Sequence, residues 1–174
     1  MRLYLVRHTS VDMPKGICYG QTDVELADTF PQELADVRHR LHGITFDKTY
    51  SSPLKRCAIL ARELSDEIIV DARIKEYNFG EWERKTWNEI YASDKGKEWF
   101  NDYVNTLCPK GESFAMMLHR VRVFIEHLSQ SDENILIVTH AGIIRAFLIL
   151  LENYSVEKAF DTHVVYGQVV MIEK

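Results

Sequence analysis

Two short apolar segments of this chain each lead to a histidine, and this feature limits the folds that the chain can adopt. Residues 3–6 (LYLV) run into Arg7 and His8, and residues 135–138 (ILIV) lead to His140. Segments of this length and content are typical of strands that are buried on both faces of a parallel sheet. Because ligands of such sheets bind beyond the carboxyl ends of the strands, we expect both histidines at one ligand-binding edge.

Helical and strand patterns alternate along the rest of the chain. Apolar residues recur at helical spacing in residues 31–43, 51–64, 114–128 and 141–152, and short strands are predicted at residues 49–51 and 68–70. The helix of residues 51–64 has a serine cap and Pro53 in its first turn. Residues 164–172 (VVYGQVVMI), with Gly167 at their centre, predict a pair of short strands. This alternation predicts an α/β fold of three layers, α/β/α, with a mostly parallel central sheet.

Residues 71–109 differ from this pattern, because they carry all three tryptophans and show helical periodicity only from about Thr86 onward. We interpret them as an aromatic-rich excursion over one edge of the sheet, since no linker-like composition bounds them. The chain of 174 residues is 46% hydrophobic. A chain of this length buries about 70% of its unfolded surface, which is enough for one core. We therefore predict a single domain of residues 1–174.

Charge and cysteine content exclude several classes of function. The net charge of −5 argues against a general binder of nucleic acids or of anionic membranes. The three cysteines are widely spaced and predict buried thiols rather than a disulfide framework or a zinc site. No apolar stretch reaches the length of about 20 residues that a membrane span needs. We expect a cytoplasmic protein with no metal and no cofactor, and the sequence leaves the oligomeric state open.

Four cationic or titratable side chains are expected to meet at the carboxyl edge of the sheet. Arg56 lies in the first turn of the helix predicted from Pro53, where free N–H groups and the helix dipole favour an anion. Arg7, His8 and His140 would join it from the two strand ends. A single histidine or arginine at such a place is usually structural, but the combination favours a site. Two guanidinium groups beside two imidazoles would repel a divalent metal and bind a phosphoryl group.

Five motifs in order along the chain resemble the histidine phosphatase superfamily, whose fold is that of phosphoglycerate mutase. They are LVRH at residues 5–8, SSPLKR at 51–56, KEYNFGEWE at 75–83, PKGES at 109–113 and VTHAG at 138–142. Within the superfamily, the short length and residues 7–26 (RHTSVDMPKGICYGQTDVEL) are similar to the α-ribazole phosphatase branch.

The resemblance implies a mechanism with a phosphohistidine intermediate. By motif position, His8 would be the nucleophile, while Arg7, Arg56 and His140 would hold the phosphoryl oxygens. A neutral imidazole can attack phosphorus in line, which divides one difficult displacement into two easier ones. The cationic side chains would stabilise the charge of the transferred group, so no metal is required.

The resemblance implies Glu76 as the proton donor to the leaving group. A carboxyl group beside a phosphate dianion is expected to have a raised pKa, because like charges disfavour its ionised form. Glu81 and Glu83 lie close by in the sequence and stay open as alternatives, although solvated or capping roles are commoner for such glutamates.

Further residues are expected at the substrate. Thr9 replaces the glycine that usually follows the catalytic histidine of the family, and its hydroxyl or backbone N–H can bind phosphate. The segment that leaves the site loop is the expected substrate contact, through Tyr19, Gly20, Gln21 and Thr22. Trp82 could stack on a flat benzimidazole base, although tryptophans of this kind more often fill a small core.

These inferences predict a phosphomonoesterase that acts on α-ribazole 5′-phosphate and releases inorganic phosphate. The alternatives are a broad-specificity phosphatase of sugar phosphates or nucleotides, a phosphohistidine protein phosphatase, and a phosphoglycerate mutase, whose known members are longer. An alternative of another class is a catalytically silent phosphate-binding protein. The retention of Arg7, His8, Arg56 and His140 argues against that class, because a binder needs no nucleophile.

Overall fold

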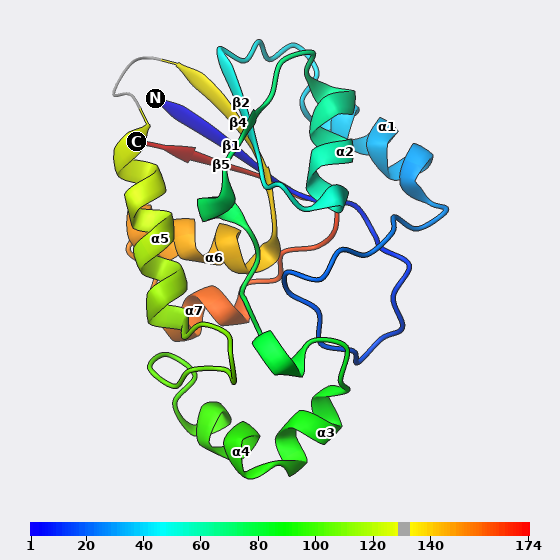
Figure 1. Ribbon diagram of the computed structural model, residues 1–174. Helices are drawn as coiled ribbons and strands as arrows, with labels where there is room; N and C mark the ends of the chain where they lie inside the picture. Colours follow the sequence, from blue (N-terminus) through cyan, green and yellow to red (C-terminus); the bar gives the residue numbers. More distant parts are fainter. Residues whose placement is uncertain (129–132) are drawn as a thin grey trace.

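A mixed sheet forms the centre of the molecule. The computed structural model describes residues 1–128 and 133–174. Within them, five strands lie in the order β3-β2-β4-β1-β5 (Figure 1). Their bounds are Arg2–Arg7 for β1, Lys48–Ser51 for β2, Ile69–Val70 for β3, Asn134–Thr139 for β4 and Val169–Glu173 for β5. All neighbouring strands pair in parallel except β5, which is antiparallel to β1, so the predicted mostly parallel sheet is confirmed.

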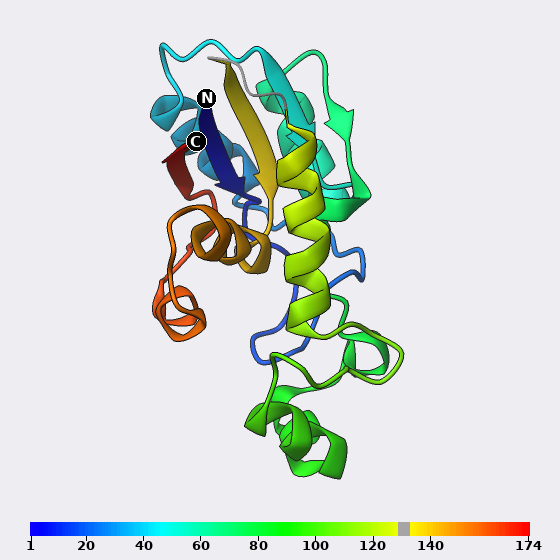
Figure 2. The same cartoon turned by 90° about the vertical axis from the view of Figure 1, so that its left-hand side faces the viewer.

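Helices cover both faces of this sheet. Helices α1 (Phe30–Arg40) and α2 (Lys55–Leu64) lie on one face, and α5 (Phe114–His127) and α6 (Ala141–Leu151) lie on the other (Figures 1 and 2). Successive strand side chains point to opposite faces, and they divide into two apolar clusters accordingly. Leu3, Leu5, Ile135 and Ile137 pack with α5 and α6, whereas Val6, Leu136 and Val138 pack with α1 and α2. The predicted three-layer α/β/α fold is confirmed.

The helix boundaries depart from the sequence prediction in two places. Helix α2 begins at Lys55, and the predicted serine cap is wrong: Leu54 is the cap residue and makes no side-chain cap bond. The Oγ of Ser52 instead accepts a hydrogen bond from the Leu54 N–H at 3.3 Å, in the turn before the helix. Helix α7 (Val156–Asp161) was not predicted. Among the described residues no helix is long and apolar enough to cross a membrane.

The predicted pair of strands in residues 164–172 is also wrong, because only β5 forms there. Its partner β1 ends at Arg7, so the residues before β5 have no strand opposite them. They turn instead at Gly167, whose φ of +65° suits glycine, and the Gly167 N–H donates to the carbonyl of His8. The turn therefore lies directly against the end of β1.

The aromatic-rich residues 71–109 lie beyond the carboxyl edge of the sheet. They form the 3₁₀ turns η1 (Ala72–Ile74) and η2 (Gly80–Trp82) and the helices α3 (Trp87–Ala92) and α4 (Asp94–Asn101). Both views show α3 and α4 next to one another and away from the strands (Figures 1 and 2). Trp82 and Trp99 nevertheless belong to the same apolar cluster as Leu3 and Ile137 of the sheet. The hydrophobic core is thus continuous from the sheet into this segment.

The predicted single domain can be tested by unfolding in urea. All three tryptophans lie in residues 71–109, so their fluorescence reports on that segment, while far-ultraviolet circular dichroism reports on the helices and strands of the whole chain. Because the core is continuous, we expect both signals to change with the same midpoint and the same slope. A fluorescence transition at clearly lower urea would show that the segment unfolds by itself.

Candidate active site

The register of β1 and β4 brings the two strand-end histidines together. Arg7 lies opposite Thr139 in this parallel pair, and the His8 N–H donates to the Thr139 carbonyl at 3.0 Å. The imidazole rings of His8 and His140 follow at a centroid distance of 5.2 Å. Both side chains are buried, with exposed fractions of 2% and 0%.

His8 is held as a neutral imidazole of one orientation. Its Nδ1 lies 2.8 Å from the Thr9 carbonyl oxygen, which can only accept a hydrogen bond from the ring. Its Nε2 lies 3.3 Å from the Nε–H of Arg56, which can only donate. Burial holds the pKa of His8 well below its ordinary value, and the charges of Arg56 and Arg7 lower it further. The ring therefore carries its proton on Nδ1 and a lone pair on Nε2.

Arg56 is completely buried and is held by backbone carbonyl groups of residues 20–22. Its Nη2 donates to the Gly20 carbonyl at 2.5 Å, and its Nη1 donates to the Thr22 carbonyl at 2.9 Å. Gly20 and Thr22, which the sequence assigned to the substrate, thus direct their carbonyl groups at Arg56. Between them, the Gln21 side chain donates through Nε2 to the Glu76 carbonyl at 3.0 Å.

Arg7 and Thr9 each leave a buried polar atom without a partner among the described residues. The Nη1 of Arg7 donates to the Val164 carbonyl at 2.5 Å, and its guanidinium carbon lies 3.8 Å from the centre of the Tyr166 ring. Its Nε and the Thr9 Oγ1 have no hydrogen-bond partner. Buried donors are almost always satisfied in proteins, so this pair indicates a place for a polar ligand.

His140 lies next to His8 and is also neutral. Its Nε2 is 2.8 Å from the Ser52 Oγ and 3.4 Å from the Cys57 Sγ. Burial lowers its pKa well below the ordinary value, and the charge of Arg56 adds to this. A bound dianion would act in the opposite direction, because an opposite charge favours the protonated imidazole. A protonated His140 would therefore require a bound anion to be present.

The carboxylate of Glu76 lies at the start of α6, close to His140. Its Oε2 accepts from the Gly142 N–H at 3.2 Å, and its Oε1 accepts from the Tyr77 N–H at 2.9 Å. A Cβ atom at position 142 would collide with Oε1 of Glu76, so the absence of a side chain there makes room for the carboxylate.

The two other candidate glutamates point elsewhere. Glu81 is exposed and forms an ion pair with Lys110 at 2.5 Å, which lowers the pKa of that carboxyl group. Glu83 accepts hydrogen bonds from the backbone N–H groups of Gln21 and Thr22, at 2.9 and 2.5 Å. Glu83 therefore fastens the loop whose carbonyl groups hold Arg56.

A cavity beside Glu76 is lined mainly by aromatic rings. Its wall includes Tyr19, Phe79, Trp99, Tyr103, Phe114 and Phe160, together with one cation, Arg145. Of the predicted substrate contacts, Tyr19 thus faces this aromatic cavity. Trp82 does not, because it is only 4% exposed and packs against Trp99 at a centroid distance of 5.7 Å. This placement speaks against the predicted stacking of Trp82 on a substrate.

Several residues of the site had no signal in the sequence. The sequence places Tyr166 in a predicted strand and assigns no site role to Ser52 or Arg145. Each reaches the site only through the packing of distant segments. Among the described residues, no group of three or more histidine, cysteine, aspartate or glutamate side chains is arranged to hold a metal ion.

Comparisons with known proteins identify the family of the chain. The model of the histidine phosphatase superfamily (branch 1) matches residues 3–174. A putative phosphoserine phosphatase 2 of Hydrogenobacter thermophilus is 35% identical, over 93% of this chain and 84% of that protein. The adenosylcobalamin/α-ribazole phosphatase of Escherichia coli is 30% identical, over 96% of this chain and 87% of that protein.

Solved structures show the same architecture. The crystal structure of the α-ribazole phosphatase from Shigella flexneri superimposes with a TM-score of 0.90 at 27% identity, covering 99% of this chain and 90% of that one. A putative α-ribazole-5′-phosphate phosphatase from Escherichia coli gives a TM-score of 0.89, also at 27% identity, over 98% and 89%. Because the family model spans nearly the whole sequence, the chain belongs to the histidine phosphatase superfamily (branch 1).

Proposed function

We propose that this chain is a metal-independent phosphomonoesterase that works through a phosphohistidine at His8. Its family and several relatives support phosphatase activity. The observation that carries the proposal is the state of His8, whose Nδ1 is occupied by the Thr9 carbonyl and whose Nε2 lone pair faces Arg56. A phosphoryl group that enters between His8 and Arg56 would accept the hydrogen bond that Arg56 now donates to Nε2. The lone pair on Nε2 would then be free to attack phosphorus.

In the first half of the reaction, Nε2 of His8 attacks phosphorus in line. The new bond joins nitrogen to phosphorus, and the bond from phosphorus to the ester oxygen breaks. The protonated Glu76 carboxyl group gives its proton to that oxygen, so the leaving group departs as a neutral alcohol. The position of the Glu76 carboxylate near His140, at the start of α6, supports this role.

In the second half, water attacks the phosphohistidine. The Glu76 carboxylate takes a proton from the water, the phosphorus–nitrogen bond breaks, and neutral His8 and inorganic phosphate are restored. Arg7, Arg56, Thr9 and His140 would hold the three equatorial oxygens during both steps. Because these donors are in place beforehand, they stabilise the transferred charge without further rearrangement. Nothing in this scheme needs a metal.

The substrate that we propose is α-ribazole 5′-phosphate. Two relatives named for this activity support it, one at 30% sequence identity and one by its crystal structure. The aromatic cavity beside Glu76 supports it further, since a flat heterocycle can pack against rings such as Tyr19 and Phe79.

A second candidate substrate is phosphoserine. The relative at 35% identity is named as a putative phosphoserine phosphatase. Arg145 in the wall of the same cavity would offer a guanidinium to the carboxylate of such a substrate. Its Nε and Nη2 already donate to the Ala159 and Thr162 carbonyls, so the side chain is fixed in place.

The nucleophile can be tested with the His8→Ala variant and a chromogenic aryl phosphate. We expect hydrolysis to fall by at least about 10³-fold, because no other side chain replaces the nucleophile. Wild-type activity should survive EDTA, and the trapped phosphoenzyme should be labile in acid and stable in base. His39→Ala, at an exposed position on α1, is the control and should behave like wild type. Full activity of His8→Ala would contradict the proposal. Loss of the wild-type activity in EDTA would contradict it as well.

The proton donor can be tested with Glu76→Gln, which keeps the shape of the side chain. We expect kcat/KM for an alkyl phosphate to fall by about 10²–10⁴-fold, since the leaving oxygen would lose its proton source. Binding of inorganic phosphate, measured by calorimetry, should persist. Glu81→Gln removes an exposed carboxylate nearby and should leave the rate unchanged. Near-normal turnover in Glu76→Gln would remove Glu76 from this role.

The substrate can be decided by comparing kcat/KM for α-ribazole 5′-phosphate, phosphoserine and a sugar phosphate. We expect the first to be highest, and Tyr19→Ala to reduce it by about tenfold through lost stacking while phosphoserine is less affected. Tyr91→Ala, at a position on α3 that is 61% exposed, serves as the control. A higher value for phosphoserine would favour the second candidate, and equal values would indicate broad specificity.

A further inference from the structure

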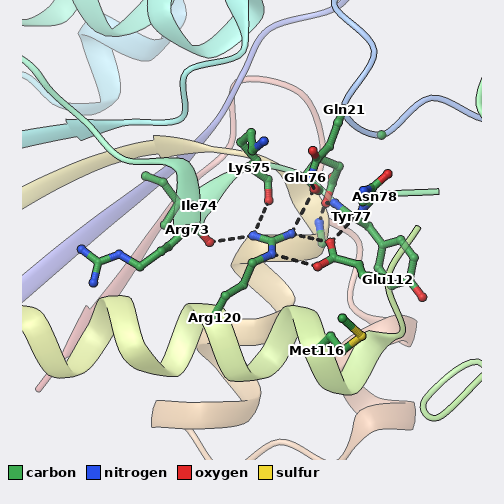
Figure 3. Close-up of polar contacts among 12 residues, drawn as sticks. Gln21, Arg73, Ile74, Lys75, Glu76, Tyr77, Asn78, Glu112, Met116 and Arg120 are labelled. Carbon is green, nitrogen blue, oxygen red and sulfur yellow. Dashed lines mark hydrogen bonds and ion pairs between the residues drawn. The ribbon is translucent and has the colours of Figure 1, made fainter. Parts of the chain in front are cut away.

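Arg120 lies on α5 and donates hydrogen bonds to backbone carbonyl groups of the segment that leads to Glu76. Its Nη1 donates to the carbonyls of Arg73 and Lys75 at 2.6 and 2.7 Å, and its Nη2 donates to the Glu76 carbonyl at 3.0 Å. Figure 3 shows the guanidinium reaching from the helix to these carbonyl groups. One side chain thus fixes the backbone just before and at Glu76.

Glu112 completes the arrangement from the other side. Its carboxylate accepts from Arg120 at Nε (3.0 Å) and at Nη2 (2.6 Å), so all three guanidinium nitrogens are used. The same carboxylate accepts from the Asn78 N–H at 2.8 Å, and the Glu112 N–H donates to the Asn78 carbonyl at 3.0 Å. The backbone is therefore held on both sides of Glu76 (Figure 3).

The pair is well shielded from water. The exposed fractions of the two side chains are 20% for Arg120 and 10% for Glu112. A charge pair in such a place costs desolvation energy and is maintained only when further hydrogen bonds satisfy it, as the carbonyls do here. Packing alone could be achieved there with apolar side chains, whereas fixing the directions of three carbonyl groups within four residues needs the planar fork of an arginine.

We propose that Arg120, together with Glu112, is a positioning residue that holds Glu76 at the reacting oxygen. This inference rests on the proposed function, in which Glu76 gives its proton to the leaving group. The carboxylate is fixed at its tip by the N–H groups of Gly142 and Tyr77, and at its backbone by Arg120. Loss of Arg120 leaves the Glu76 carbonyl with the Gln21 side chain alone and releases the carbonyls of Arg73 and Lys75. A displacement of about 1 Å at a catalytic group can reduce the rate by about 10²-fold.

The test uses substrates whose leaving groups differ in their need for a proton. A dinitrophenyl phosphate releases a stable anion, whereas an alkyl phosphate needs the proton of Glu76. The constant kcat/KM reports only the steps up to departure of the leaving group, so it isolates the first half of the reaction. For Arg120→Lys we expect a loss of about 10²-fold with the alkyl phosphate and little change with the dinitrophenyl phosphate.

Two further variants sharpen the test. Arg38→Gln breaks an exposed ion pair elsewhere in the fold, that with Glu63 at 2.9 Å, and should leave both rates at the wild-type level. Glu112→Gln retains the arginine but weakens its hold, so it should show the pattern of Arg120→Lys to a smaller degree. If Arg120→Lys does not fold, as judged by circular dichroism, Glu112→Gln carries the test alone.

The double variant Glu76→Gln/Arg120→Lys should lose no more activity than Glu76→Gln, because both changes remove the same proton transfer. Equal losses with both leaving groups, or additive losses in the double variant, would overturn the positioning role. The proposed function fails separately, if Glu76→Gln itself shows no dependence on the leaving group or if the wild type hydrolyses neither ester.

Discussion

The parallel pairing of β1 with β4 is the constraint on which the site depends. It places the residue after each strand at the same level of the sheet edge, so that the imidazoles of His8 and His140 meet. A shift of one residue would turn each side chain of β1 to the opposite face and exchange the two apolar clusters. Because both faces are buried, the packing of the helices and the meeting of the histidines are specified by the same register.

The charges of the site are held by neutral groups. Arg7 donates to the carbonyl of Val164, and Arg56 to those of Gly20 and Thr22; among the described residues neither forms an ion pair with a carboxylate. Carbonyl dipoles satisfy the hydrogen-bonding needs of a guanidinium but leave its net charge in place. The two neutral histidines add no negative charge. Even when the carboxylate of Glu76 is counted, Arg7 and Arg56 leave the site with an excess of positive charge, which suits an anionic ligand.

The features of the site that follow from local pattern were predictable from the sequence, and those that depend on packing were not. Strand ends and a helix start are visible in short segments, which is why His8, His140 and Arg56 could be placed at one edge. Arg120 shows no such pattern, because an arginine on a polar stretch of helix is usually solvated and its carbonyl partners lie some 45 residues away. The burial of Trp82 likewise depends on the way in which α4 folds back over it.

The contact between Gly142 and Glu76 has a consequence for how this sequence can change over time. Position 142 has no space for a methyl group while the carboxylate stays where it is, whereas its neighbour Ala141 already carries one. Alanine at 142 would displace the Glu76 carboxylate, which is the movable end of a side chain, without requiring the backbone of α6 to move. Under the proposed function, in which this carboxylate gives its proton to the leaving group, one nucleotide change in the codon for position 142 would separate turnover from the binding of the phosphate ester.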